Sequence, residues 1–349
     1  MNRWRILADD LTGALDTAAA FCGAQQVPVF LQASTSTAPV QAWSTATRDM
    51  PPSDLPAALD ACLPWLRAPG HFAFKKVDSL LRGNSFAEVA WLLRHGGFAG
   101  AVFAPAFPAQ GRFTQDGQHW AGPPQQPGVP QAAIDVRAAF AAEGLSTYTG
   151  HALDADGGVL LPDVRSDADL DRIAQLSRQP AAARWLWCGS AGLAWALARC
   201  WQHAPASVAA PNSGLTHLVS ASRHPVLRGQ LTGLAGVTAM PLHDLSSTQP
   251  LSAAEARLQL AAGAQQLVHS LPCPANLVVV GGDTLLALCQ AAGAHGLHAS
   301  ASPRSGWGRA ELQGGVWHGA TVYSRSGAFG APDDLSALLA RLTEKETSL

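Results

Sequence analysis

A repeated pattern limits most strongly how this chain can fold. Five short apolar runs are each followed by a turn rich in Gly, Ser or Asp and then by an Ala- and Leu-rich stretch. The runs begin at Arg5, Phe72, Trp185, Leu218 and Leu277. A repeated order of strand, turn and helix predicts βαβ units around a parallel sheet. In such folds ligand-binding residues follow the carboxyl ends of the strands. We therefore expect functional side chains in these turns.

Length and one linker-like segment predict two domains. A chain of 349 residues exceeds the usual size of a single domain. A stretch rich in Pro, Ala and Ser separates a helical run from a new strand at 204–214. We expect an α/β protein with one domain at 1–203 and another at 215–349, each a largely parallel sheet flanked by helices. The cleft between two such domains is the default place for an active site.

The composition is that of a globular protein, with 48% hydrophobic and 14% charged residues. No apolar run reaches the roughly 18 residues of a membrane span, and Asp9 and Asp10 interrupt the N-terminal apolar stretch before it could act as a signal peptide. Six scattered cysteines without a Cys-x-x-Cys pair predict reduced thiols. The formal net charge of -2 gives no basic field for nucleic acid. We therefore expect a cytoplasmic protein with neither a membrane nor a nucleic-acid partner.

Two adjacent carboxylates, Asp9 and Asp10, follow the first predicted strand. Carboxylates at such a position can accept hydrogen bonds from sugar hydroxyls, hold a metal ion or act as a base. The alternative is structural: one carboxylate caps the following helix and the other is solvated. This turn alone leaves both interpretations open.

A second turn precedes a predicted helix from Ser85 to Arg94 and concentrates polar side chains. Only three of the 23 basic residues are lysines, and two of them are adjacent, which indicates a need for a compact ammonium group. A lysine point charge and a planar arginine fork suit a carboxylate or phosphate, and an aspartate can accept a hydroxyl proton. The alternative is an exposed cluster that neutralises itself. The candidate residues are Lys76, Asp78, Ser79, Arg82 and Gly83.

Two turns in the C-terminal third have the composition of phosphate sites. Gly281, Gly282, Asp283 and Thr284 separate a predicted strand from a predicted helix. Glycines let backbone N–H groups approach an anion, and a helix N-terminus adds partial positive charge. The turn at 323–330 offers a second backbone cradle, with Arg325 countering phosphate charge. The alternatives are a tight turn capped by Asp283 and Thr284 and an ordinary loop before a helix from Asp333 to Arg341.

Several familiar motifs are absent from the sequence. No lysine follows a glycine at Walker A spacing, and no Gly-x-Gly-x-x-Gly opens a helix after a strand. Cys188 replaces the first glycine of a serine-hydrolase elbow. His295 and His298 form the only close histidine pair and lack acidic or cysteine companions. Residues 109–131, rich in Gln, Pro and Gly, predict an irregular surface loop.

Four motifs in order, Ala8–Ala14, Lys75–Asn84, Pro105–Arg112 and Gly281–Thr284, resemble the four-carbon acid sugar kinase family. The resemblance covers nearly the whole chain. It implies an N-terminal acid-sugar-binding domain, a C-terminal ATP-binding domain and transfer of phosphate from ATP to the terminal hydroxyl of a threonate, erythronate or oxo-tetronate, giving its 4-phosphate.

The resemblance also implies roles for individual residues. The acid sugar would face Asp9, Asp10, Lys76, Asp78, Ser79, Arg82 and Gly83, with Asp10 or Asp78 as the base. ATP would contact Ser222, Gly281, Gly282, Asp283, Thr284, Ser326 and Gly327, with Mg²⁺ as the counter-charge of the phosphates. The expected partner is the small acid, and a homodimer is left open.

Two alternatives remain from the sequence. Ala221 and Ala328 stand where the family has glycine, which favours an acid-sugar-binding protein of the same fold that has lost ATP binding. The second alternative is an aldolase or isomerase that uses Lys75 or Lys76 as a Schiff-base amine.

Overall fold

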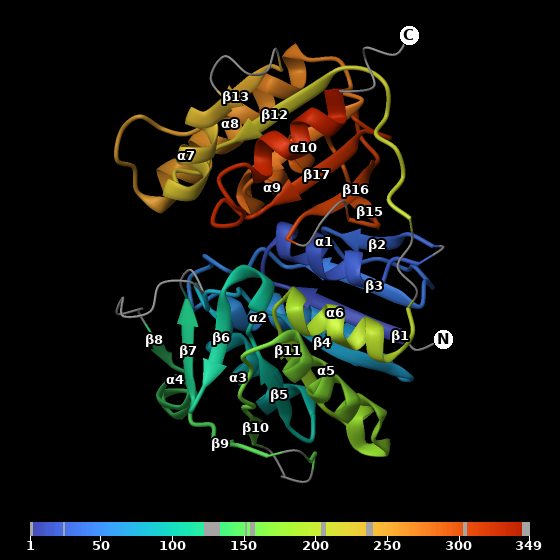
Figure 1. Cartoon of the computed structure of the whole chain (residues 1–349), viewed down its shortest axis with the longest axis vertical. Coiled ribbons are helices and arrows are strands. Elements are labelled where there is room, and N and C mark those ends of the chain that lie inside the picture. The colour runs from blue at the N-terminus through green and yellow to red at the C-terminus, as the bar shows by residue number, and fades with distance from the viewer. Residues whose placement is uncertain are drawn as a thin grey trace. The chain divides into compact units, whose positions relative to one another are not determined.

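The computed structural model describes residues 3–23, 25–121, 133–150, 152–153, 158–203, 207–234, 240–302 and 306–343. The chain divides into two compact units, residues 1–205 and 206–349 (Figure 1). Both units combine a mostly parallel sheet with helices, which confirms the predicted α/β class.

The first unit contains an eight-stranded sheet whose described pairings are all parallel. The runs predicted at Arg5, Phe72 and Trp185 are three adjacent strands of this sheet, so their carboxyl ends lie at one edge. In order across the sheet the strands are β2 (Val27–Phe30), β3 (Val40–Ser44), β1 (Arg3–Ala8), β4 (His71–Lys76), β11 (Leu186–Gly189), β5 (Ala101–Ala104), β10 (Val159–Leu160) and β9 (Thr147–Tyr148).

Helices cover both faces of this sheet (Figure 1). One face carries α2 (Leu55–Leu66), α3 (Ser85–Gly96) and α4 (Val136–Ala142), and the other carries α1 (Leu11–Ala20), α5 (Asp167–Gln175) and α6 (Ala191–Cys200). Side chains of a strand alternate between faces. Leu7 accordingly packs with residues of α2 and α3, whereas Trp4 stacks on Phe72 on the opposite face, with ring centroids 4.7 Å apart. Short 3-10 helices complete the unit at Pro108–Gln110, Leu176–Arg178 and Pro180–Arg184.

A separate antiparallel sheet is formed by β6 (Arg112–Gln115), β7 (Gln118–Ala121) and β8 (Ala133–Asp135). The prediction of an irregular loop at 109–131 is therefore wrong for 112–121, while 122–131 lies outside the described residues. Asp116 and Gly117 connect β6 to β7 with φ of 53° and 81°. Two consecutive positive φ angles suit a tight hairpin turn, and Asp-Gly is the dipeptide that favours it.

The second unit has six described strands. In the order given next, the first four strands pair in parallel, and the fifth strand pairs antiparallel with its neighbour on each side. In order they are β13 (Leu242–Asp244), β12 (Thr216–Ser220), β14 (Asn276–Val280), β17 (Thr321–Arg325), β16 (Gly308–Gln313) and β15 (Gly296–Ser300). One face is covered by α7 (Pro225–Leu234) and α10 (Asp334–Thr343), and the other by α8 (Ala253–Ser270) and α9 (Gly282–Ala291) (Figure 1).

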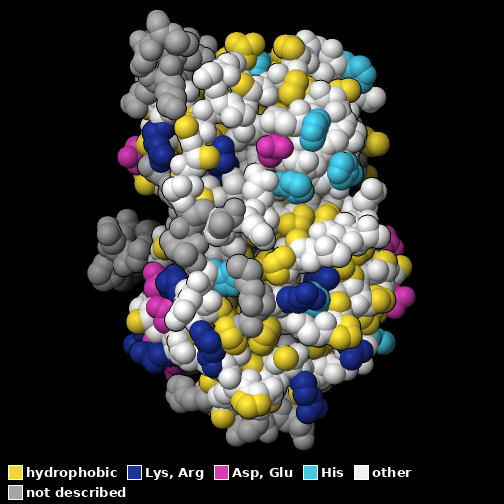
Figure 2. Space-filling model, turned by 90° about the vertical axis from the view of Figure 1, so that its right-hand side faces the viewer, with side chains coloured by type: hydrophobic (Ala, Val, Ile, Leu, Met, Phe, Trp, Pro, Cys, Tyr) yellow, Lys and Arg dark blue, Asp and Glu magenta, His cyan; other side chains and the backbone are white. Residues whose placement is uncertain are grey.

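Three further features concern the length of the helices, the cysteines and the side chains at the surface. None of the described helices is long and apolar enough to cross a membrane. All six cysteines are free thiols, and only Cys273 is exposed. On the face drawn in Figure 2, Lys and Arg side chains are interspersed with acidic and hydrophobic ones.

Candidate active site

Three carboxylates of the first unit converge on one arginine at the carboxyl ends of β3, β1 and β4. Arg48 lies 2.8 Å (Nε to Oδ2) from Asp9, 2.6 Å (Nη1 to Oδ2) from Asp10 and 3.6 Å (Nη2 to Oδ1) from Asp78. All three aspartates are buried. The predicted residues of the first and second turns therefore form one charged cluster, with Arg48 at its centre.

This arrangement keeps Asp10 and Asp78 ionised. Burial by itself would raise the pKa of Asp10, but Arg48 and Lys76 outweigh it and lower that pKa below its ordinary value. Burial would also raise the pKa of Asp78, but the hydrogen bonds from Arg82 and the charge of Arg48 hold it well below its usual range. Both side chains are thus hydrogen-bond acceptors at neutral pH.

Asp10 has a structural and a site role at once. It is the N-cap of α1, and its Oδ1 accepts a hydrogen bond of 2.8 Å from the Gly13 amide. Its Oδ2 accepts from Thr12 Oγ1 at 2.8 Å and from Arg48. The capping interpretation of this turn is therefore correct for Asp10, while Asp9 is not solvated but is bound by the Arg48 fork through both oxygens.

Sequence reasoning missed Arg48, which stands in no Gly-rich or acidic motif. Two residues of the second turn fix its backbone. Asn84 Nδ2 donates to the carbonyls of Thr47 and Met50, each at 2.8 Å. Gly83 has φ of 72°, and a Cβ there would lie 2.3 Å from the Arg48 carbonyl oxygen. The available signal was weak, since Arg48 follows a short stretch at 40–44 that mixes Val, Ala and Trp with Gln and Ser.

The turn at 77–84 is organised around the carboxylate of Asp78. Its Oδ2 accepts from the amides of Leu80 at 3.3 Å and Arg82 at 3.1 Å. The Arg82 guanidinium binds both oxygens, with Nε to Oδ2 at 2.7 Å and Nη2 to Oδ1 at 2.8 Å. These contacts hold Leu81 at φ of 55°, a conformation that side chains other than glycine rarely adopt. The turn is thus a rigid structure and not a loose surface cluster.

The two adjacent lysines lie on opposite sides of β4. Lys76 Nζ donates to the Val77 carbonyl at 2.8 Å and lies beside Asp10, since a Cβ on Gly13 would be within 2.8 Å of Lys76 Nζ and 2.5 Å of Asp10 Oδ1. Lys75 forms a fully buried ion pair with Glu88 of α3. Burial would lower the pKa of Lys75, but Glu88 outweighs it and raises that pKa.

In the second unit the predicted nucleotide turns meet at one sheet edge, because β12, β14 and β17 are neighbours and Ser220, Val280 and Arg325 are in register. Ser220 Oγ donates to the Val280 carbonyl at 2.6 Å, and the Ala221 amide donates to Thr284 Oγ1 at 3.1 Å. A Cβ on Gly327 would lie 2.3 Å from Ser222 Oγ. Ser222, Thr284 and Gly327 thus belong to one interlocked set of turns.

The entry to α9 has the backbone features of an anion site. Gly281 is its N-cap with φ of 123° and has no side chain that could cap the helix. Gly282 and Asp283 form the first turn, with Asp283 exposed. The side chain of Thr284 is used by the Ala221 amide and not by the helix N-terminus, so the predicted capping alternative does not hold for Thr284.

Arg325 is held by contacts within the second unit, which speaks against the expectation that its guanidinium counters phosphate charge. Its guanidinium is fully buried, donates to Gln230 Oε1 and to the Phe329 carbonyl, and lies 4.9 Å above the Trp307 ring. Burial lowers its pKa to about 10. The cause is alternation: Arg325 shares the face of Tyr323, which packs against α7 and α10.

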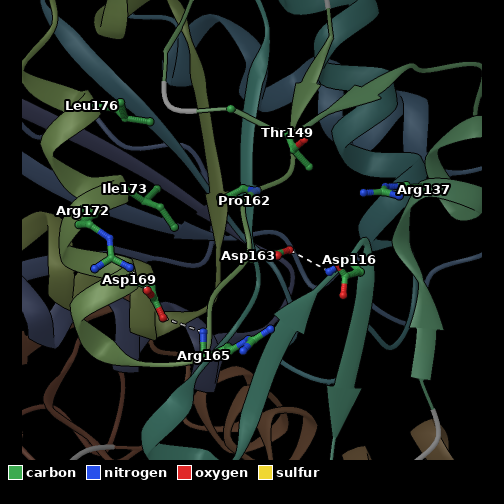
Figure 3. A pocket seen from close by; sticks show the side chains of 11 residues that line it. Asp116, Arg137, Thr149, Pro162, Asp163, Arg165, Asp169, Arg172, Ile173 and Leu176 are labelled. Carbon is green, nitrogen blue, oxygen red and sulfur yellow. Dashed lines mark hydrogen bonds and ion pairs between the residues drawn. The ribbon is translucent and has the colours of Figure 1, made fainter.

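A cavity of about 880 Å³ in the first unit contains none of the predicted site residues (Figure 3). Its acidic and basic side chains largely satisfy one another or the backbone. Asp163 accepts a hydrogen bond from the Asp116 amide at 2.9 Å, and Asp169 caps α5 while pairing with Arg172. Within the described ranges, no group of three or more His, Cys, Asp or Glu side chains could hold a metal ion.

Comparison with known proteins shows what this chain is similar to. Residues 4–137 match the family model described as a sugar-binding N-terminal domain. A D-threonate kinase of Cupriavidus necator is 33% identical over 288 residues, covering 71% of this chain and 65% of that protein. One from Salmonella typhimurium is 34% identical over 55% of this chain and 52% of its own length. One from Bordetella bronchiseptica is 28% identical over 95% of both.

These matches agree with the resemblance seen in the sequence motifs: residues 4–137 match a sugar-binding N-terminal domain, and the chain is similar to D-threonate kinases. The alignments with the Cupriavidus and Salmonella proteins span about two thirds and about half of those proteins.

Solved structures show the same fold. A Salmonella typhimurium protein, provisionally described as a tRNA synthase, superposes with a TM-score of 0.74 over 99% of this chain and 100% of its own, at 19% identity. A Haemophilus influenzae protein of a family of unknown function superposes with a TM-score of 0.65 over 97% of this chain and 100% of its own, at 17% identity.

Proposed function

We propose that this protein is an ATP-dependent kinase that phosphorylates the terminal hydroxyl of a four-carbon acid sugar, giving a tetronate 4-phosphate. The observation that carries the proposal is the buried cluster of Asp9, Asp10 and Asp78 around Arg48, with Lys76 beside it. Alternating acids and bases at one sheet edge provide acceptors for sugar hydroxyls and cations for a carboxylate. The D-threonate kinase relatives support this choice of substrate class.

In the substrate half, Lys76, Arg82 and Ser79 are proposed to orient the acid sugar and Asp10 to accept the hydroxyl proton. Asp78 has both oxygens committed to Arg82 and to two amides, whereas Asp10 accepts from Gly13, Thr12 and Arg48. A carboxylate has about four lone-pair sites, so Asp10 retains more capacity for a substrate hydroxyl. The lowered pKa of Asp10 makes it a weak base, which suits a transition state that needs positioning and charge stabilisation most.

In the nucleotide half, the turns at Ser222, Gly281–Thr284 and Ser326–Gly327 are proposed to hold the phosphates of ATP. Their fit is supported by the N-terminus of α9, whose N-cap is a glycine, and by the close packing of Gly327 against Ser222. Bound ATP supplies the transferred phosphoryl group, and Mg²⁺ neutralises its charge. An active site in the cleft between the domains, a cytoplasmic location and a homodimer stay predictions.

The structure weakens both alternatives. Ala221 and Ala328 are not among the described non-glycine residues with positive φ, so neither replacement of glycine strains the nucleotide turns. A Schiff-base amine must be accessible and have a lowered pKa, whereas Lys75 is buried against Glu88 with a raised pKa. Lys76 is also buried, and its Nζ donates to the Val77 carbonyl. We therefore favour the kinase over a binding protein without ATP or a Schiff-base enzyme.

The test is ADP release by the purified protein with ATP and Mg²⁺ against threonate, erythronate and their oxo relatives, with three- and five-carbon acids as length controls. We expect turnover with a four-carbon acid, and its loss in Asp78→Asn and Gly282→Val. Asp171→Asn, at the exposed ion pair between Asp171 of α5 and Arg199 of α6, is the matched control and should retain turnover. Acid-dependent thermal stabilisation without any ADP release would instead support the binding protein.

A further inference from the structure

The hairpin formed by β6 and β7 reaches the substrate turn through one buried histidine. His119 Nε2 lies 2.8 Å from the Ser79 carbonyl oxygen, and His119 Nδ1 lies 3.1 Å from Thr114 Oγ1. His119, Thr114 and Ser79 are 1%, 0% and 3% exposed. Their burial shields these hydrogen bonds from solvent.

The partners of the ring determine its tautomer. A carbonyl oxygen only accepts, so His119 Nε2 carries the proton and donates to Ser79. Nδ1 of the neutral ring is then the acceptor, and the Thr114 hydroxyl donates to it. Burial, with a contribution from Arg112, lowers the pKa of His119 and favours this neutral form.

Thr114 is itself fixed. Its amide and carbonyl form the reciprocal pair of hydrogen bonds with Val164 at 2.9 and 2.8 Å. The hairpin is thus tied to the segment before α5. A chain of hydrogen bonds runs from it through Thr114 and His119 to Ser79 in the substrate turn.

The substrate turn needs this link because of its strained backbone. Asp78 satisfies the amides of Leu80 and Arg82, but the Ser79 carbonyl points away from that carboxylate and toward His119. A buried carbonyl without a donor is destabilising, and the turn also holds Leu81 at positive φ. Without His119, a rotation of the peptide after Ser79 would relieve the unpaired carbonyl and so lower the free energy of the turn. The same rotation would move the Leu80 amide away from Asp78.

We propose that His119, oriented by Thr114, is a positioning residue that fixes the substrate turn of Ser79 to Arg82 and thereby sets affinity for the acid sugar. His119 does not contact the reacting atoms in this account. Its action on the acid sugar rests on the proposed function, whereas its action on the backbone of the turn does not.

The first test concerns the turn alone. Amide hydrogen exchange at Leu80 and Arg82 is measured in the unmodified protein and in two variants. His119→Leu removes the donor to the Ser79 carbonyl, whereas the side-chain amide of His119→Gln can still donate to it. We expect exchange at both amides to accelerate about 10-fold or more in His119→Leu, the factor that corresponds to about 1.4 kcal/mol, and to return toward the original rate in His119→Gln. Unchanged exchange in His119→Leu would overturn the inference whether or not the protein is a kinase.

The second test separates positioning from general destabilisation. We expect His119→Leu to raise KM for the acid sugar about 10-fold without changing KM for ATP, and Thr114→Val to act in the same direction more weakly while leaving the ring in place. His71→Leu, the same change at a half-buried histidine remote from the turn, is the control. Equal rises in both KM values, or equal effects of His71→Leu, would contradict positioning. Absence of turnover in the unmodified protein would refute the proposed function but leave the exchange result standing.

Discussion

Replacing Arg48 with methionine is the perturbation that most strongly probes the charged cluster. Arg48 compensates three buried carboxylates, and its side chain is 15% exposed. Asp78 retains Arg82 and Asp10 retains Lys76, but the fork that binds both oxygens of Asp9 is lost. Removing one partner of a buried ion pair costs about 3–5 kcal/mol. We expect Arg48→Met to lower the free energy of unfolding by about that amount at pH 7.

The same substitution should reverse the pH dependence of stability. With Arg48 present the pKa of Asp10 is lowered on folding, so this group stabilises the protein above the unfolded pKa and loses that contribution as pH falls through the folded pKa. Without Arg48, burial is the dominant influence and the pKa of Asp10 should rise above its unfolded value. The folded state then binds the proton more tightly, so Arg48→Met should regain stability as pH falls from 7 toward 5.

Urea unfolding followed by tryptophan fluorescence, at pH 5, 6, 7 and 8, measures both effects. Arg48→Lys is the matched control, since it keeps the charge without the fork and should lose less stability and show no reversal. A loss below about 1 kcal/mol in Arg48→Met, with the original pH profile, would refute the argument that these carboxylates depend on Arg48.

Three further outcomes follow from the contacts. Lys75→Met leaves the buried Glu88 carboxylate unpaired and should cost about 3–5 kcal/mol, whereas Lys75→Met combined with Glu88→Leu should recover most of it; equal losses in urea unfolding would contradict the pairing. Gly281→Ala, at φ of 123°, should cost about 1–3 kcal/mol and weaken ATP binding by calorimetry, while Gly229→Ala in α7, where an added Cβ meets nothing within 4 Å, should do neither. Cys273, the exposed thiol, should react first with a thiol reagent in the folded protein, and this fast phase should vanish in Cys273→Ser.

The strand-and-turn pattern of the sequence was sufficient for the fold class and for most of the cluster. Buried parallel strands have near-continuous apolar runs, which is why β1, β4, β11, β12 and β14 lie where the runs predict them. Since parallel strands end at one edge, residues after β1 and β4 had to be neighbours. Asp9, Asp10, Lys76 and Asp78 therefore come together as expected.

The rest depended on tertiary contacts that leave no local pattern. Arg48 acquires its place through Asn84 and Gly83, 36 and 35 residues later in the chain, and no spacing rule connects them. Arg325 lies at the end of a strand, where alternation alone does not say which face is the core. The hairpin at 112–121 did carry a local signal, Asp116-Gly117, but the loop prediction used only the content of Gln, Pro and Gly.

The most direct measurement of the central claim is the position of phosphate in the product. After reaction with ATP, Mg²⁺ and uniformly ¹³C-labelled threonate or erythronate, phosphorus-carbon coupling in the NMR spectrum identifies the esterified oxygen. We expect coupling to the terminal methylene carbon, with none of this product formed by Asp78→Asn. Phosphate on another oxygen or on the carboxylate, or no phosphorylated acid with any four-carbon substrate, would contradict the proposed placement of the acid sugar by Lys76, Asp78 and Arg82.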